Sequence, residues 1–394
     1  MKYGLIGYPL GQSYSKEIHE KLGLDYQLME VENLDVFMKS LDFQGFNVTI
    51  PYKEKIIAYL DSLDEKADEI GAVNTVVRQK DGSLKGYNTD YYGLKYLMRN
   101  VQIKNSKVAI LGSGGTSHTA QALCRDFGAS EIIVISRKGE ITYEDCSKYE
   151  DADVLINTTP VGMSPKVDEI PINLDVFTSL KAVVDVIYNP LETALVYEAR
   201  KRGIYAINGL EMLVAQALFA EEIFLNIKLE DLDISEIVNS LHKINIVIIG
   251  MPGCGKSTVG KLLADKLKMD FYDSDILLGN PGEIIENCGE KEFRLREREV
   301  IKSLSPKNNS VVAVGGGSLL LEDNIRLLRA NGTKFVLVLR DLDKLDQANR
   351  PLSKDLQALW EARKDIYYMN ADIIVENNGS ISECVEKIYE IISD

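Results

Sequence analysis

Histidine, tryptophan and cysteine are scarce in this chain of 394 residues, and long apolar runs are missing. The chain has three histidines, one tryptophan and five scattered cysteines without a C-x-x-C pair. Neighbouring residues therefore cannot assemble a zinc site, and we expect reduced thiols. No apolar run reaches the roughly 18 residues of a membrane span. Residues 1–9 lack the apolar region of a signal peptide, so we expect a cytoplasmic protein.

Positive charge is also in deficit. The 45 Lys and Arg residues face 60 Asp and Glu residues, which gives a net charge of −15 at pH 7. This balance argues against nucleic acid and anionic membranes as partners. Because salt screens charges over about 8 Å at physiological ionic strength, a local Arg or Lys in a cleft can still bind an anion. We therefore expect small-molecule substrates, and the charge leaves the oligomeric state open.

A glycine-rich loop that contains a lysine follows a buried strand near the middle of the chain. Residues 246–249 are apolar and β-branched, Gly250-x-x-x-x-Gly255-Lys256-Ser257 comes next, and residues 259–267 have helical spacing. In a phosphate-binding loop, backbone N–H groups and a helix N-terminus hold phosphates, the lysine adds charge, and the hydroxyl can ligate Mg²⁺. The predicted nucleotide-binding residues are Gly253, Cys254, Gly255, Lys256, Ser257 and Thr258.

A second glycine-rich loop has the context of a dinucleotide site. Residues 107–111 predict a strand, residues 119–126 a helix and residues 131–136 another strand, with Gly112-Ser113-Gly114-Gly115-Thr116 between the first two. This is a Rossmann βαβ unit, in which the end of the second strand selects the cofactor. Ser136-Arg137-Lys138 stands there instead of an acid, which favours the 2′-phosphate of NADP. The alternative is that both cations are solvated turn residues.

Polar side chains follow several predicted strands in the first hundred residues. Ser13 and Ser15 offer hydroxyls to a polyhydroxy ligand or cap a helix. Lys53 follows a strand that ends at Pro51, and Asp90 follows a later one. A lysine and an aspartate on one substrate hydroxyl would form a proton-transfer pair, although spacing alone does not show that these two meet.

Residues 1–240 resemble shikimate dehydrogenase. The matching motifs are the Ser13/Ser15 loop, Asn47-Val-Thr49-Ile-Pro-Tyr-Lys53, Ala72-Val-Asn74-Thr, Asn88-Thr-Asp90, the Gly112 loop, Asn157-Thr-Thr-Pro-Val-Gly-Met, Tyr188-x-Pro and Gly209-x-x-Met-Leu-x-x-Gln216. The resemblance implies that Lys53 and Asp90 are catalytic. It implies shikimate contacts from Ser13, Ser15, Thr49, Asn74, Asp90, Tyr188 and Gln216. It also implies NADP contacts from Gly112 to Thr116, from Ser136, Arg137 and Lys138, and from Gly209. The family commonly has Asn-Arg-Thr at 136–138, of which this chain keeps Arg137.

The C-terminal region adds acidic, basic and glycine-rich motifs behind the phosphate-binding loop. Asp273 and Asp275 follow a predicted strand, and one interpretation is an acidic strand end that holds Mg²⁺. The other gives them separate roles, with Asp273 near the Mg²⁺ ion and Asp275 orienting a substrate hydroxyl or accepting its proton. Arg294 and Glu297 share one face of a predicted helix. Three glycines at 315–317 end another strand, where backbone N–H groups can approach an anion.

Residues 244–394 resemble shikimate kinase. The resemblance implies that shikimate is bound by Asp275, Arg294, Gly316, Gly317 and Arg363, and that Arg350 lies over the ATP phosphates. Lys256, Asp275 and Arg350 would be the catalytic residues, with Ser257 and Asp273 at the Mg²⁺ ion. The segment between Arg340 and Arg350 is shorter than the family's usual lid and lacks a second arginine to stack on adenine. This departure bears on nucleotide affinity and on suppression of ATP hydrolysis.

These features predict an α/β chain of three parts. They are a substrate-binding domain over 1–100 completed by helices over 209–241, a Rossmann NADP-binding domain over 101–208, and a P-loop nucleoside-monophosphate-kinase-like domain over 244–394. Residues 225–241 predict an amphipathic helix that either closes the first domain or forms a helical linker. The predicted function is NADPH-dependent reduction of 3-dehydroshikimate followed by ATP- and Mg²⁺-dependent phosphorylation of shikimate. The alternatives are a metabolite-sensing regulator built from decayed enzyme domains, and a quinate/shikimate or NAD-using dehydrogenase with a weak kinase domain.

Overall fold

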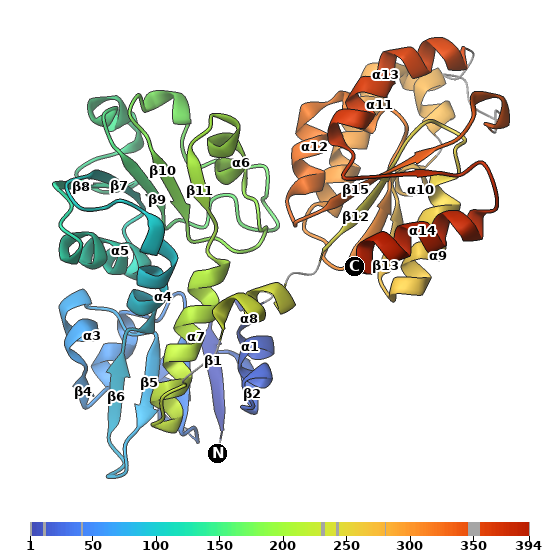
Figure 1. The fold of residues 1–394 in the computed structure, drawn as a ribbon. Coiled ribbons are helices and arrows are strands. Elements are labelled where there is room, and N and C mark those ends of the chain that lie inside the picture. The colour runs from blue at the N-terminus through green and yellow to red at the C-terminus, as the bar shows by residue number, and fades with distance from the viewer. Residues whose placement is uncertain are drawn as a thin grey trace. The chain divides into compact units, whose positions relative to one another are not determined.

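The chain forms two compact units, each of which we describe separately. The computed structural model describes residues 2–10, 13–40, 42–229, 233–241, 244–279, 281–345 and 355–393. The first unit comprises residues 1–161, 170–188 and 195–241, and the second comprises 162–169, 189–194 and 242–394. Helices and strands alternate through both units, which confirms the predicted α/β class (Figure 1). The predicted domain boundaries stay predictions.

The first sheet is mixed and has the strand order β2-β1-β3-β5-β6-β4. Its strands are β1 (Tyr3–Gly7), β2 (Tyr26–Glu30), β3 (Gly45–Val48), β4 (Ser62–Leu63), β5 (Thr75–Arg78) and β6 (Leu84–Tyr87). Strand β1 pairs in parallel with β2 and β3, whereas β5 runs antiparallel to β3 and β6. The helices of this part are α1 (Ser15–Lys21), α2 (Leu34–Lys39), α3 (Glu65–Ile70), α4 (Thr89–Leu97), α7 (Leu210–Leu225) and α8 (Ile234–Leu241). Helix α7 packs against α1 and α4.

The second sheet is parallel throughout and has the order β11-β10-β9-β7-β8. Its strands are β7 (Lys107–Leu111), β8 (Glu131–Ile135), β9 (Val154–Asn157), β10 (Ala182–Asp185) and β11 (Tyr205–Ile207). Helix α5 (Gly115–Asp126) packs on β7 and β8, and α6 (Ala194–Lys201) precedes β11 (Figure 1). The order reverses beside β7, at the loop between β7 and α5, which is where ligands bind in open parallel sheets.

The third sheet is also parallel and has the order β13-β14-β12-β15-β16. Its strands are β12 (Ile246–Ile249), β13 (Asp270–Asp273), β14 (Ser310–Ala313), β15 (Lys334–Leu339) and β16 (Ile373–Glu376). The helices are α9 (Lys256–Leu267), α10 (Ser274–Leu278), α11 (Pro281–Leu304), α12 (Glu322–Arg329), α13 (Leu356–Asn370) and α14 (Ile381–Ser393). Short 3₁₀ turns lie at η1 (Lys55–Tyr59), η2 (Met98–Asn100), η3 (Tyr143–Tyr149), η4 (Leu174–Val176), η5 (Ser318–Leu320) and η6 (Leu342–Lys344).

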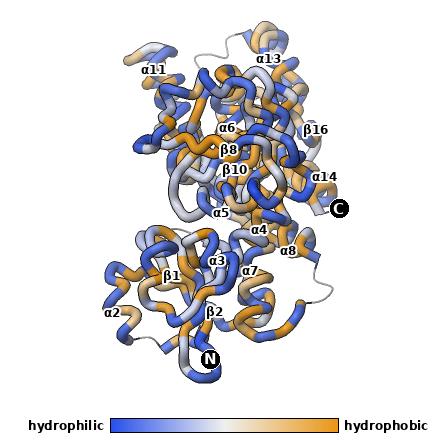
Figure 2. Tube along the Cα trace, turned by 90° about the vertical axis from the view of Figure 1, so that its left-hand side faces the viewer, coloured by the Kyte–Doolittle hydropathy of each residue, from blue (hydrophilic) through white to orange (hydrophobic). Residues whose placement is uncertain are grey.

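The parallel strands are apolar because both of their faces are buried. On β7, Val108 and Ile110 belong to one hydrophobic cluster, and Ala109 and Leu111 belong to another. Figure 2 shows such hydrophobic segments, for example at β8, and helices whose colour alternates between orange and blue along the chain. Burial of these strands holds their ends in fixed positions. The polar loops that follow the strands are therefore also held in place, and these loops carry the predicted ligand-binding residues. Within the described residues, no helix is both long and apolar enough to span a membrane.

The prediction of one continuous helix over 225–241 is wrong at its start. Helix α7 ends at Leu225, and Asn226 caps it in the left-handed conformation with φ 53°. Asparagine tolerates this conformation and ends helices in the same way as glycine. Among the described residues of this stretch, Ile234–Leu241 forms the expected helix as α8, and residues 230–232 lie outside the described part of the chain. The amphipathic pattern in the sequence thus continues past the end of α7, which Asn226 alone determines.

Candidate active sites

Lys53 and Asp90 meet in the first unit. Lys53 lies in the turn after β3, and Asp90 lies in the first turn of α4. The Nζ atom of Lys53 donates to Oδ2 of Asp90 at 2.6 Å, and the two side chains are 16% and 10% exposed. The side chain of Asn88 accepts from the backbone N–H of Tyr91 and caps α4. The cap therefore fixes where α4 begins, and with it the position of Asp90.

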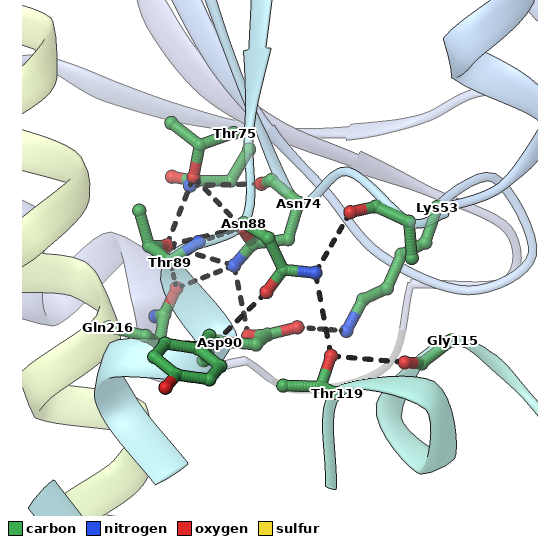
Figure 3. Close-up of polar contacts among 12 residues, drawn as sticks. Lys53, Asn74, Thr75, Asn88, Thr89, Asp90, Gly115, Thr119 and Gln216 are labelled. Carbon is green, nitrogen blue, oxygen red and sulfur yellow. Dashed lines mark hydrogen bonds and ion pairs between the residues drawn. The ribbon is translucent and has the colours of Figure 1, made fainter. Parts of the chain in front are cut away.

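A buried amide network extends from Asp90 to α7 (Figure 3). Asn74 Nδ2 donates to Asp90 Oδ1 at 2.9 Å, and Asn74 Oδ1 accepts from the backbone N–H of Thr89 at 2.6 Å. The same amide nitrogen lies 3.4 Å from Oε1 of Gln216, which α7 carries. The structure therefore brings together Asn74, Asp90 and Gln216, three residues that the sequence predicts to contact substrate.

The serine loop lies beside Tyr188. Ser13 Oγ donates to Ser15 Oγ at 3.0 Å, and the rings of Tyr14 and Tyr188 have centroids 5.6 Å apart. Burial raises the pKa of Tyr188, while a hydrogen bond with Ser13 opposes this rise. Thr49 follows β3, and a Cβ atom on Gly7 would lie 2.5 Å from its Cγ2 atom. The two serines and Tyr188 are therefore close together, and Thr49 lies at the end of β1.

The Gly112 loop, the predicted dinucleotide-binding loop, lies close to the Lys53 side chain. Gly112 has φ 107°, and a Cβ there would lie 2.7 Å from Thr158 Oγ1. The space around Gly114, the N-cap of α5, is open. A Cβ on Gly115 would lie 3.4 Å from Cβ of Lys53. Ser113 lies in the same loop, and Thr116 lies in the first turn of α5. A helix N-terminus with open glycine backbone fits a pyrophosphate, with the lysine immediately alongside.

The predicted selectivity residues follow β8. Ser136 is buried, whereas Arg137 and Lys138 are exposed. Exposed cations at this strand end fit a 2′-phosphate. Gly209 does not follow β8 but stands at the N-terminus of α7. A Cβ on Gly209 would lie only 2.0 Å from the Val186 carbonyl oxygen. This close approach after β10 explains why the position needs glycine, and the predicted cofactor contact of Gly209 stays a prediction.

The phosphate-binding loop of the second unit joins β12 to α9. Gly253 and Gly255 have φ values of 83° and 98°, which favour glycine. Lys256 is buried, and its Nζ atom donates to the carbonyl oxygens of Gly250 at 3.1 Å and Met251 at 2.9 Å. Asn377 Nδ2 donates to the buried Cys254's carbonyl oxygen at 2.8 Å. The loop is therefore braced from the end of β16.

One cavity of about 550 Å³ is lined by residues from both predicted sets of the second unit, although Cys254 is not among them. A Cβ on Gly317 would lie 2.5 Å from Nη2 of Arg294, and one on Gly315 would lie 2.9 Å from Oδ1 of Asp275. The glycines therefore let the backbone approach an arginine and an acid closely. The cavity is lined by Gly253, Gly255, Lys256, Ser257 and Thr258 from the phosphate loop, and by Asp273, Asp275, Arg294, Gly316, Gly317 and Arg363.

Glu297 lines this cavity and Tyr367 supports its wall at Gly316, although the sequence assigns no role to either residue. Glu297 is buried and accepts from Arg294 Nη1 at 2.7 Å and from Ser318 Oγ at 2.7 Å. Tyr367 donates to the carbonyl oxygen of Gly316, and burial raises its pKa to about 12. Spacing gave the signal in both cases, since Glu297 lies three residues after Arg294 and Tyr367 lies four after Arg363.

Ser257 and Asp273 offer the hydroxyl and carboxylate oxygens that Mg²⁺ prefers. Both line the cavity, and Asp273 Oδ1 also accepts from the backbone N–H of Asp275 at 2.9 Å. Among the described residues, no group of three or more His, Cys, Asp or Glu could hold a metal ion alone. The pair therefore fits an ion that brings phosphate oxygens as further ligands. Arg350 lies outside the described residues.

The fold and the two sites define a nucleotide-dependent enzyme that joins a Rossmann dehydrogenase to a P-loop kinase. Residues 5–76 match the family model for the shikimate dehydrogenase substrate binding domain, and residues 252–393 match that for shikimate kinase. Shikimate dehydrogenase (NADP⁺) of Clostridium beijerinckii is 39% identical over 254 residues, which are 58% of this chain and 93% of that protein. The chain therefore belongs to the shikimate dehydrogenase family and carries a shikimate kinase domain in addition.

Solved structures agree with this assignment. A chorismate mutase/shikimate 5-dehydrogenase fusion protein from Clostridium acetobutylicum is 39% identical with a TM-score of 0.56, covering 61% of this chain and 96% of that one. Shikimate 5-dehydrogenase from Thermus thermophilus, solved in complex with NADP(H) and shikimate, is 29% identical with a TM-score of 0.55, covering 61% of this chain and 98% of that one.

Proposed function

We propose that this chain catalyses two consecutive reactions on one small cyclic acid. The first is reduction of 3-dehydroshikimate to shikimate with NADPH, and the second is transfer of the ATP γ-phosphoryl group to the 3-hydroxyl of shikimate. The observation that carries the proposal is the ion pair of Lys53 and Asp90 beside the Gly115 loop in one unit, together with the Lys256 cavity in the other.

In the first reaction, the Lys53 ammonium group protonates the alkoxide that forms at the substrate's carbonyl oxygen. NADPH supplies the hydride to the carbonyl carbon when it is bound at the Gly112 loop. Asp90 orients Lys53 through the 2.6 Å contact, and Asn74 holds the other carboxylate oxygen. Such positioned proton donors contribute about 10²–10⁴-fold to a rate. Ser13, Ser15, Thr49, Tyr188 and Gln216 would bind the substrate's hydroxyl and carboxylate groups.

In the second reaction, Asp275 orients the 3-hydroxyl of shikimate toward the γ-phosphorus. Arg294 and Arg363 hold the substrate carboxylate, since guanidinium groups match carboxylates in a bidentate manner. The backbone N–H groups of Gly316 and Gly317, which line the same cavity as Arg294, would add hydrogen bonds to the substrate. Lys256, Ser257, Asp273 and Mg²⁺ would stabilise the charge of the phosphates, and Arg350 would do so from the lid.

The test is a coupled assay with 3-dehydroshikimate, NADPH and ATP–Mg²⁺ in one cuvette. The proposal predicts NADPH oxidation without ATP, and ADP release only when shikimate is supplied or formed. A regulator built from decayed domains would bind shikimate and turn over neither cofactor. Steady-state kinetics with NADPH against NADH, and with shikimate against quinate, separate the remaining alternatives. We also expect the reactions to take place in the cytoplasm.

A further inference from the structure

A buried histidine–glutamate pair joins two helices of the first unit. Nδ1 of His19 on α1 lies 3.0 Å from Oε2 of Glu221 on α7, and the side chains are 0% and 1% exposed. The residues are 202 positions apart in the sequence. The pair therefore fixes one helix from the start of the chain against another from the end of the first unit.

This pair is a costly way to hold two helices together. Burial of ionisable groups is offset only when further hydrogen bonds satisfy their remaining polar atoms. His19 Nε2 and Glu221 Oε1 have no hydrogen-bond partner in the described part of the chain. Two apolar side chains of similar volume would hold the helices with equal or greater stability. The pair is therefore better explained by the geometry that it imposes than by stability.

Both helices carry predicted substrate contacts. Ser15 begins α1 and lies one turn before His19, so the two side chains share a face of the helix. Gln216 lies on α7, one and a half turns before Glu221, and contacts Asn74. A shift of α1 along α7 would therefore change the distance between the Ser15 hydroxyl and the Gln216 amide.

The pair also contacts the network behind Asp90. The ring of His19 stacks on that of Tyr26, with centroids 4.1 Å apart and planes inclined by 17°. The Tyr26 hydroxyl donates to Asn47 Oδ1 at 2.6 Å, and Asn47 Nδ2 donates to the carbonyl oxygen of Asn74 at 3.2 Å. Asn74 in turn holds Asp90. A continuous series of buried contacts thus runs from His19 to the Lys53–Asp90 pair.

We propose that His19 and Glu221 are positioning residues of the dehydrogenase, which set the spacing of Ser15 and Gln216 so that both reach one shikimate molecule. The inference rests on the proposed dehydrogenase function. Neither residue touches substrate, because both side chains are fully buried behind the site. Loss of the pair therefore affects how substrate is bound, and the kinase cavity, which belongs to the other unit, is unaffected.

The experiment compares Glu221→Leu, His19→Leu and the double substitution in the full-length chain. The dehydrogenase KM for shikimate, its kcat, the melting temperature and the kinase rate of the same sample are measured. We expect each single variant to melt earlier and to have a KM raised about tenfold or more, because misplaced hydrogen bonds cost that much affinity. The double Leu variant should regain the melting temperature and keep the raised KM.

The conservative variant Glu221→Gln, which can still hydrogen-bond His19, should keep KM within about threefold of the wild type. A double Leu variant that regains both the melting temperature and the wild-type KM would show that the pair is only structural and would overturn the inference. An unchanged KM in a folded single variant would do the same. If the single variants do not fold, the double variant decides. Failure of the proposed function is distinct, because the wild type itself would then lack dehydrogenase activity.

Discussion

The Nζ atom of Lys53 and the Oδ2 atom of Asp90 lie 2.6 Å apart. In the sequence, β4, α3, β5 and β6 all lie between Lys53, which follows β3, and Asp90, which lies in α4. The Gly115 backbone of the dinucleotide loop lies near the same lysine, since a Cβ added to Gly115 would be 3.4 Å from Lys53 Cβ. A proton donor, its carboxylate partner and the predicted cofactor loop therefore meet at one place. The first prediction tests this arrangement.

Lys53→Ala should lower the dehydrogenase kcat by about 10²–10⁴-fold, because the alkoxide loses its proton donor. The KM for NADPH should change little, and the kinase rate of the same sample should stay normal. Lys55→Ala is the matched control, since Lys55 is exposed in the turn η1. A Lys53→Ala protein with normal kcat would refute the catalytic role.

Arg137→Asp should raise the KM for NADPH by about 10–100-fold, because a charge-assisted contact with the 2′-phosphate becomes a repulsion. The KM for NADH should stay the same or fall. Arg125→Asp provides the control, since this exposed arginine lies in the last turn of α5. Equal effects of Arg137→Asp on both cofactors would show that Arg137 does not read the phosphate.

Glu297→Gln should raise the kinase KM for shikimate by about tenfold, because Arg294 loses the carboxylate that orients it at 2.7 Å. The dehydrogenase parameters should not change, and neither should the KM for ATP. Glu299→Gln is the control, because Glu299 is exposed and contacts Arg298 instead. If only the KM for ATP rose, Glu297 would act on the nucleotide and our assignment of the cavity would be wrong.

Asp126→Asn should destabilise the first unit by at most about 1 kcal/mol at neutral pH, since partly exposed ion pairs are screened by solvent. The hydrogen bond from Lys66, and then that from Tyr91, hold the pKa of Asp126 below its ordinary value of 3.8. A lowered carboxyl pKa stabilises the fold above the unfolded-state value, and this contribution is lost as the pH falls through the folded-state value.

The difference in melting temperature between wild type and Asp126→Asn should therefore be largest near neutral pH and shrink below about pH 4. Circular dichroism follows the whole chain, and fluorescence of Trp360, the chain's one tryptophan, reports the second unit alone. A difference that stays constant down to about pH 3 would show that the carboxylate charge has no part in it.

Local sequence patterns predicted the glycine loops because their chemistry is contained in a few consecutive residues. Gly112 and Gly255 need positive φ, and each stands between a buried strand and a helix. The Arg294–Glu297 contact follows from helical spacing alone. By contrast, His19 and Glu221 are brought together only by the packing of α1 on α7, and no local pattern marks either residue.

The convergence of Lys53 and Asp90 has the same origin. Each residue follows its own strand, β3 or β6, and these two strands lie on either side of β5 in the first sheet. Both run antiparallel to β5, so their ends reach the same edge of the sheet. The error in the 225–241 helix had a local cause, since Asn226 ends α7 within a continuous amphipathic pattern. Periodicity predicts which face of a helix is buried more reliably than it predicts where the helix stops.

Calorimetric titration of the full chain with shikimate tests most directly whether two separate sites bind the same acid. We predict two binding events per chain, with Gln216→Ala removing one and Arg363→Ala removing the other. A single event per chain, or one substitution that abolishes both, would contradict this account.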